Sequence, residues 1–149
     1  MKVLFLDIDG VLNSEHWFIN RPEKGGLYTQ VDPHAVAILN RVIKETKCSI
    51  VVSSTWRKVH KEDTIPVLTS AGLVYSGSWN YTPILHKKRG YEIQQYLSEH
   101  PEIVSYAIID DDSDMLPEQL PYFVQSDWKT GLDNTRADKL IEILNNNLK

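Results

Sequence analysis

The sequence contains one cysteine, Cys48, and therefore cannot form a disulfide within the chain. A single cysteine is typical of proteins in a reducing compartment, so we expect a cytoplasmic protein. The apolar run near the N-terminus, residues 3–6, ends at Asp7 and is too short for a signal peptide or a membrane span. Repeats and low-complexity linkers are also missing, which predicts that the 149 residues form a single domain, residues 1–149.

An excess of positive charge is missing as well. Lys and Arg together number 16 and Asp and Glu 20, which gives a formal net charge of −4. This balance excludes a generally basic nucleic-acid-binding protein, although it leaves room for a local basic patch. Hydrophobic residues make up 42% of the chain and charged residues 24%, the mixture of an ordinary globular protein rather than of a disordered or fibrous one.

Short apolar runs alternate with segments of helical periodicity along the chain. The runs predict five strands, at residues 3–6, 49–52, 73–75, 104–109 and 122–124. Helices are predicted from an Asp32–Pro33 cap to residue 43, over 64–71, from 89 or 90 to 100, and along an apolar stripe from 137 to 148. This alternation predicts an α/β fold with a mostly parallel sheet, whose ligand site lies at the carboxyl ends of the strands.

Two carboxylates, Asp7 and Asp9, follow the first predicted strand. Positions i and i+2 of an extended chain point the same way, and two carboxylates on one face favour a shared divalent cation. Hard oxygen ligands without nearby His or Cys favour Mg²⁺ over Zn²⁺. The plain alternative is an acidic turn in water.

Three further polar clusters open or close predicted elements at the same rim. Ser53 and Ser54 follow the second strand, where a hydroxyl and free N–H groups suit an oxyanion, although serines there also form ordinary turns. A basic run precedes a helix at residues 86–89, and four acids crowd residues 110–114 after the fourth strand. Crowded acids repel one another unless a cation neutralises them, so one shared site is favoured over several unrelated solvated turns.

Residues 7–13, Asp-Ile-Asp-Gly-Val-Leu-Asn, resemble the first motif of the haloacid dehalogenase-like (HAD) phosphohydrolase superfamily. Ser53 resembles the second motif, and residues 108–114 resemble the fourth. Within the superfamily, residues 53–57 are similar to small phage and bacterial members, including the phosphatase domains of RNA-repair proteins. The resemblance implies a Rossmann-like three-layer sandwich with a five-stranded, mostly parallel sheet. Many relatives carry a cap domain, but the segments between Asn13 and Asp32 and between Arg57 and Lys87 are short here, so we expect a small flap around residues 14–30 and no large cap domain.

The resemblance also implies a role for each matching residue. Asp7 would be the nucleophile that forms an aspartyl-phosphate, and Asp9 the general acid and then the general base. Ser53 would bind the phosphoryl oxygens. Mg²⁺ would be held by Asp7, by the main-chain carbonyl of Asp9 and by an acid of the fourth motif.

Two positions stay open at this point. The third motif normally supplies a lysine, and here Lys87, Lys88 and Arg89 compete for the role, with Arg89 best spaced to the following helix. For the metal ligand of the fourth motif we prefer Asp111, with Asp110 as a second or water-mediated ligand. Asp112 and Asp114 are then expected outside the first coordination shell.

The leading hypothesis is a Mg²⁺-dependent phosphomonoesterase acting on a phosphorylated substrate, a nucleotide or a nucleic-acid end. An open site would admit a bulky substrate, and a basic rim with two tryptophans for stacking is expected from Trp56, Trp79, Arg57, Lys58, Lys61, Lys87, Lys88 and Arg89. One alternative is a catalytically weak nucleic-acid- or phosphate-binding module that retains the metal site. A response-receiver domain is disfavoured. Receivers place paired acids after the first strand and the phospho-acceptor after the third, whereas this chain has its acid cluster after the fourth predicted strand and no clear acceptor after Tyr75.

Overall fold

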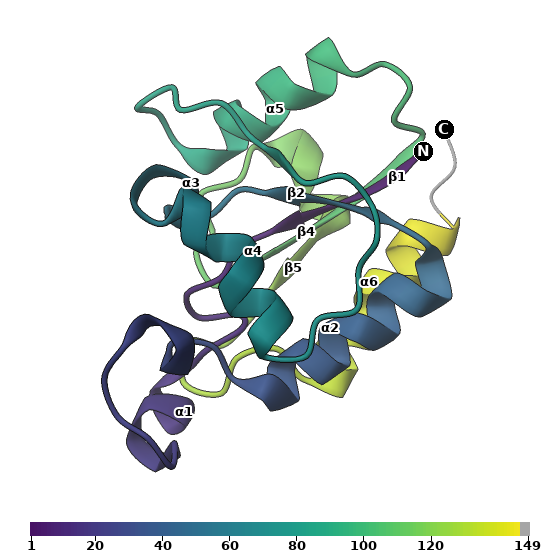
Figure 1. The fold of residues 1–149 in the computed structure, drawn as a ribbon. Coiled ribbons are helices and arrows are strands. Elements are labelled where there is room, and N and C mark those ends of the chain that lie inside the picture. The colour runs from purple at the N-terminus through teal and green to yellow at the C-terminus, as the bar shows by residue number, and fades with distance from the viewer. Residues whose placement is uncertain (147–149) are drawn as a thin grey trace.

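The structure is a computed structural model that describes residues 1–146, so the predicted end of the last apolar stripe at Leu148 lies outside the described residues. Its centre is a five-stranded parallel sheet in the order β3-β2-β1-β4-β5. The strands are β1 (Lys2–Leu6), β2 (Ser49–Val52), β3 (Asn80–Tyr81), β4 (Ser105–Asp110) and β5 (Phe123–Gln125). Figure 1 shows helices on both sides of this sheet, which confirms the predicted Rossmann-like α/β sandwich.

The helices connect the strands in chain order. They are α1 (Glu15–Asn20), α2 (Pro33–Thr46), α3 (Trp56–Val59), α4 (Lys61–Ser70), α5 (Arg89–Glu99) and α6 (Asn134–Asn146), with 3₁₀ turns η1 (Leu27–Thr29) and η2 (Pro117–Tyr122). The predicted cap of α2 is confirmed, because the Asp32 carboxylate accepts a hydrogen bond from the His34 N–H and Pro33 occupies the first turn. None of the helices among residues 1–146 has the length and apolar character that a membrane crossing requires.

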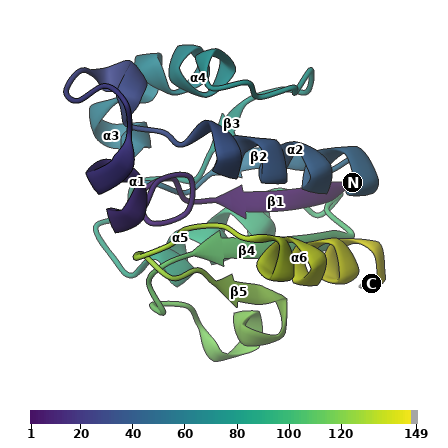
Figure 2. The same ribbon diagram turned by 90° about the horizontal axis from the view of Figure 1, so that it is seen from below.

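Alternate residues of the central strands face two separate cores. Leu4 and Leu6 of β1 pack on the side of α2 and α6, and Val3 and Phe5 pack on the side of α5. Figure 2 shows α2 and α6 side by side across the near face of β1 and β4, with α5 behind the sheet. Because the strands are covered on both faces, their sequences are continuously apolar, as expected for a parallel sheet.

The strand predicted at residues 73–75 is wrong, and the strand at this edge of the sheet is β3 instead. Only Leu73 of that run is buried, whereas Val74 is 75% exposed. The Tyr75 side chain satisfies the edge of β2 instead, since its hydroxyl accepts a hydrogen bond from the Ile50 N–H at 3.0 Å. The Tyr75 side chain thus replaces a backbone partner at this part of β2, and the pairing of β2 with β3 begins only where Val51 is in register with Asn80.

Candidate active site

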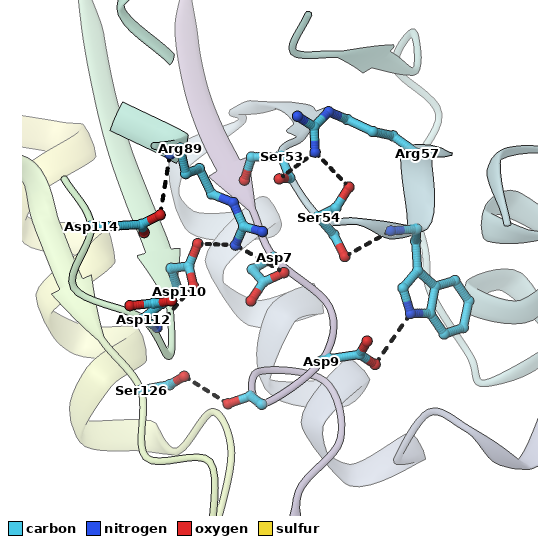
Figure 3. Close-up of polar contacts among 12 residues, drawn as sticks. Asp7, Asp9, Ser53, Ser54, Arg57, Arg89, Asp110, Asp112, Asp114 and Ser126 are labelled. Atoms are coloured by element: carbon cyan, nitrogen blue, oxygen red, sulfur yellow. Dashed lines mark hydrogen bonds and ion pairs between the residues drawn. The ribbon is translucent and has the colours of Figure 1, made fainter. Parts of the chain in front are cut away.

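Three neighbouring parallel strands, β1, β2 and β4, end at the same edge of the sheet, so the residues that follow them lie close together. Leu6 is in register with both Val52 and Ile109. The ladder continues by one step on each side, because the Asp7 N–H donates to the Ile109 carbonyl and the Ser53 N–H donates to the Leu6 carbonyl. Asp7, Ser53 and Asp110 are therefore neighbours although they lie far apart in the sequence (Figure 3).

Three carboxylates gather at this rim. Asp7, Asp110 and Asp111 each offer an oxygen within 4.8 Å of the others, and the first two are buried. Such an all-oxygen set fits a hard divalent cation such as Mg²⁺ and disfavours Zn²⁺. Asp112 and Asp114, expected further out, do not belong to this group among the described residues.

Gly10 allows Asp111 to reach the cluster. Its φ of +80° suits glycine, and a Cβ at this position would lie 2.2 Å from Asp111 Oδ2. Ser126 fixes the two turns to each other, since its hydroxyl donates to the Gly10 carbonyl at 2.7 Å and its N–H donates to the Asp110 carbonyl at 2.9 Å. The backbone thus holds Asp111 and Asp110 against the turn that follows β1.

Burial raises the pKa of the Asp7 carboxyl well above its ordinary value, and the negative charge of Asp110 raises it further. Burial also raises the pKa of Asp110, although the neighbouring Arg89 opposes that change. A bound cation would favour the ionised form of both carboxyls. The two pKa shifts therefore describe a pair of acids arranged for a positive charge.

One of the three candidate cations reaches these acids. The Arg89 guanidinium forms ion pairs with Asp110 and, at 3.4 Å, with Asp7. Burial by itself lowers the pKa of Arg89, but the charges of Asp7 and Asp110 outweigh it and raise the pKa above its ordinary value. Lys88 is exposed at the cap of α5 and makes no ion pair with the described acids, and the Lys87 ammonium lies over the Tyr91 ring.

The start of α5 is held close to the acid-rich turn after β4. The Asp114 carboxylate accepts a hydrogen bond from the Arg89 N–H at 3.2 Å, and its carbonyl accepts one from the Gly90 N–H at 3.1 Å. A Cβ at Gly90 would lie 2.7 Å from the Leu116 nitrogen, so only glycine permits this approach. Asp114 therefore positions the helix that carries Arg89.

Ser53 is fully buried, and its hydroxyl has no hydrogen-bond partner among the described residues. Figure 3 shows this hydroxyl pointing toward the space beside Arg89 and Asp7. A buried polar group without a partner costs about 1–3 kcal/mol. The orphaned hydroxyl, next to a guanidinium, fits a bound oxyanion.

Asp9 does not share the face of Asp7, contrary to the expectation from strand alternation. β1 ends at Leu6 and the chain turns at once, with the Val11 and Leu12 N–H groups donating to the Ile8 carbonyl. The Asp9 side chain is exposed, and its Oδ1 accepts hydrogen bonds from Trp56 Nε1 at 3.1 Å and Asn13 Nδ2 at 2.9 Å. Its side chain is therefore outside the acid cluster.

The family model described as the HAD domain in Swiss Army Knife RNA repair proteins matches residues 3–137. The chain belongs to this family. The match confirms the resemblance drawn from the motifs and places this HAD domain in a superfamily of phosphohydrolases. No curated protein and no solved structure matches the chain significantly.

Arg57 of the HAD domain is a buried structural residue, and its predicted place on a basic rim is wrong. Burial lowers the pKa of its guanidinium, against the opposing charge of Glu92, to which it is ion-paired at 2.6 Å. It also donates hydrogen bonds to four main-chain carbonyls, those of Ser53, Ser54, Thr82 and Pro83. Arg57 thus ties the turn that carries Ser53 to the helix that carries Arg89, a role that no local sequence signal revealed.

The rest of the predicted rim is also altered in this HAD domain. Trp56 is buried beside Asp9 and presents no free face for stacking, whereas Trp79 is partly buried and packs edge-on against Tyr75. The Lys61 ammonium lies over the Tyr81 ring. Arg89 is engaged by the acids, which leaves the four lysines of the expected set, Lys58, Lys61, Lys87 and Lys88, as its exposed cations.

The expected flap of the HAD domain consists of α1, η1 and the segment between them. Trp17 Nε1 donates to the Thr29 carbonyl at 2.9 Å, which folds the segment back on itself. Asn13, which holds Asp9, also donates to the Gln30 carbonyl at 2.9 Å. The flap is therefore attached directly to the residue that orients Asp9.

Proposed function

We propose that this HAD domain is a Mg²⁺-dependent phosphomonoesterase in which Asp7 is the nucleophile. The observation that carries the proposal is the convergence of four groups at one rim. The buried Asp7 carboxylate clusters with Asp110 and Asp111, an acid pair suited to a cation. The Arg89 guanidinium is ion-paired with Asp7 and Asp110, and the partnerless Ser53 hydroxyl points toward the same space.

In the first step, an Asp7 oxygen attacks the phosphorus atom of the substrate and displaces the alcohol. The new bond joins Asp7 to phosphorus, and the breaking bond joins phosphorus to the leaving oxygen, which takes a proton from Asp9. Arg89 and Ser53 hold the phosphoryl oxygens and stabilise the charge on them. Asp9 is oriented for this transfer by Trp56 and Asn13.

In the second step, water attacks the aspartyl-phosphate and gives a proton to Asp9. Inorganic phosphate leaves and the Asp7 carboxylate is restored. The side chains of Asp7, Asp110 and Asp111, with the main-chain carbonyl of Asp9, would hold Mg²⁺. When bound, Mg²⁺ supplies the positive charge that allows an anionic carboxylate to approach an anionic phosphate.

For the substrate we propose a nucleotide or a nucleic-acid end, in the cytoplasm. The description of the matched family, which names RNA repair, supports this choice. No second domain covers the sheet within residues 1–146, which leaves the rim open to a large substrate. The buried Arg57 and Trp56 remove one cation and one stacking ring from the expected basic rim.

The proposal is tested by release of inorganic phosphate in the presence of Mg²⁺. The screen covers mononucleotides, oligonucleotides phosphorylated at the 5′ or 3′ end, sugar phosphates and phosphopeptides. We expect Asp7→Asn to abolish release and Asp112→Asn, an exposed acid beside the cluster, to retain most of it. Phosphate release that survives Asp7→Asn in pure protein would contradict the nucleophile assignment.

A further inference from the structure

A cavity of about 460 Å³ lies beside Asp9, between the flap and α3. Leu27 and Gln30 line it on the flap side, and Trp56 and Val59 line it on the side of α3. Its volume falls within the range of about 300–1,000 Å³ that is typical of small-ligand sites. Because Val59 is 72% exposed, the cavity is open to solvent at this wall, and a ligand can extend out of it.

The position of this cavity assigns it to one part of the substrate, an inference that rests on the proposed phosphomonoesterase reaction. Asp9, which gives a proton to the leaving oxygen in that reaction, is one of the lining residues, whereas Asp7 and Ser53 are not. Trp56 connects the two spaces, because it lines the cavity and its Nε1 donates to Asp9 Oδ1 at 3.1 Å. The leaving group of a bound phosphomonoester therefore lies in this cavity. This placement depends on where the Asp9 side chain lies and not on its charge.

The walls of the cavity suit a nucleoside. Leu27, Trp56 and Val59 supply apolar surface against which a base or a sugar ring can pack. Gln30 and Thr55 supply an amide and a hydroxyl, which can form hydrogen bonds with the polar edge of a base or with a sugar hydroxyl. No lysine or arginine is among the described residues that line the cavity, so an uncharged nucleoside fits it better than a further phosphate does.

Lys58 is the cation at the mouth of this cavity. It lies in α3 between two residues that line the cavity, it is exposed, and it forms no ion pair with any residue in the range 1–146. The neighbouring imidazole of His60 lies 3.8 Å from the Asp63 carboxylate. Lys61 and Glu62, the first residues of α4, offset each other in charge. Lys58 is therefore the neighbouring cation that is left to pair with an anionic group of the substrate.

The chemistry of a nucleic-acid strand connects these two features. The next phosphate group of a strand follows its terminal nucleoside directly. A terminal nucleoside inside the cavity therefore brings the first phosphodiester to the mouth, where Lys58 lies.

We propose that the cavity binds the terminal nucleoside of a single-stranded nucleic acid and that Lys58 binds the phosphodiester that follows it. A phosphorylated strand end is then a better substrate than the matching mononucleotide, which has no phosphodiester. The strand is single, because a base that enters the cavity must first leave its pairing partner and its stack.

The role of Lys58 is tested with a phosphorylated dinucleotide and the matching mononucleotide, at the 5′ or 3′ end that the release screen favours. We expect kcat/KM to be about threefold to fivefold higher for the dinucleotide at low salt, the effect of one exposed ion pair, and rising salt should reduce the difference. Lys58→Ala should bring the ratio close to one by lowering kcat/KM for the dinucleotide. Lys44→Ala, at an exposed lysine of α2 away from this cavity, is the matched control and should preserve the ratio.

The place of the nucleoside is tested without any variant, by a dinucleotide whose terminal residue is a stable abasic tetrahydrofuran analogue. Loss of the base should lower kcat/KM by about tenfold, because the base loses its contacts in the cavity. Leu27→Trp, which fills the cavity, should lower kcat/KM for the intact dinucleotide several times more strongly than for acetyl phosphate, whose leaving group is too small to need the cavity.

Two results would overturn the inference while leaving the proposed reaction intact. One is a dinucleotide preference that is absent or unaffected by Lys58→Ala. The other is an abasic dinucleotide that reacts as fast as the intact one. Absence of Mg²⁺-dependent phosphate release from every substrate, acetyl phosphate included, would overturn the proposed function and this inference with it.

Discussion

The hydrogen bond from Trp56 to Asp9 makes the proposed proton transfer measurable. Trp56→Phe removes the indole N–H and keeps an aromatic ring in the buried position next to His60. A hydrogen bond to a charged group contributes about 1.5–3 kcal/mol. The lower value applies here, because Asp9 is exposed and Asn13 still donates to the same oxygen. A loss of about 1.4 kcal/mol of transition-state stabilisation corresponds to about a tenfold lower rate.

Two substrates of similar size separate this effect from general damage. Benzyl phosphate releases an alkoxide that must be protonated, whereas p-nitrophenyl phosphate releases a stable phenolate that needs little help. We compare kcat/KM, which covers only the steps up to loss of the leaving group and is independent of the later attack of water. For Trp56→Phe we expect about a tenfold drop with benzyl phosphate and little change with p-nitrophenyl phosphate.

Two controls complete this experiment. In an Asp9→Asn background, Trp56→Phe should cause no further loss with benzyl phosphate, since the two residues act as one unit. Trp128→Phe, at a half-exposed tryptophan outside the site, should affect neither substrate. An equal drop with both substrates after Trp56→Phe would refute the reasoning, because it would assign Trp56 to packing rather than to Asp9.

Three further predictions follow from the site. The pKa of Asp7 is raised in the folded protein, so in EDTA its contribution to the free energy of unfolding is complete below pH 3.8, its ordinary pKa, and is lost as the pH rises through the folded pKa. Asp7→Asn should therefore flatten this decline of stability with pH. Mg²⁺ should raise the Tm of the wild type more than that of the variant. Gly10→Ala should lower Tm, because an alanine in this left-handed conformation costs about 1–3 kcal/mol. The new Cβ should also displace Asp111 and so raise the Mg²⁺ concentration needed for activity. An unchanged Mg²⁺ requirement would contradict the placement of Asp111. Glu92→Ala leaves the buried Arg57 without its ionic partner and should reduce the free energy of unfolding in urea by about 3–5 kcal/mol, whereas Glu99→Ala near the exposed end of the same helix should cost far less.

Much of the fold could be predicted because its central strands are buried on both faces. Such strands must be continuously apolar, so β1, β2 and β4 are visible as short runs in the sequence. The strand at 73–75 was predicted by the same rule and was wrong, because the Tyr75 hydroxyl, not the backbone, occupies the edge of β2 there. An edge strand of two residues, like β3, has too few side chains to show a pattern.

The candidate site, like the fold, could be predicted only in part. The sequence by itself determined which acids and hydroxyls follow the strands, and the rule for parallel sheets was enough to expect them at one rim. It could not distinguish Arg89 from Lys88, because adjacent residues at a helix start differ only in the direction of their side chains. The same limit applied to Asp9, whose direction changed as soon as the chain left the strand.

Tertiary structure alone decided the burial of Arg57 and the environment of Asp7. Both depend on partners that lie tens of residues away, Glu92 for the arginine and Asp110 for the aspartate. Local patterns record the period of a strand or helix, because that period is set by neighbouring residues. The elements that pack together decide whether a cation such as Arg57 lies at the rim or is buried. They also set the electrostatic environment of a carboxyl such as Asp7, so both properties are defined only by the folded chain.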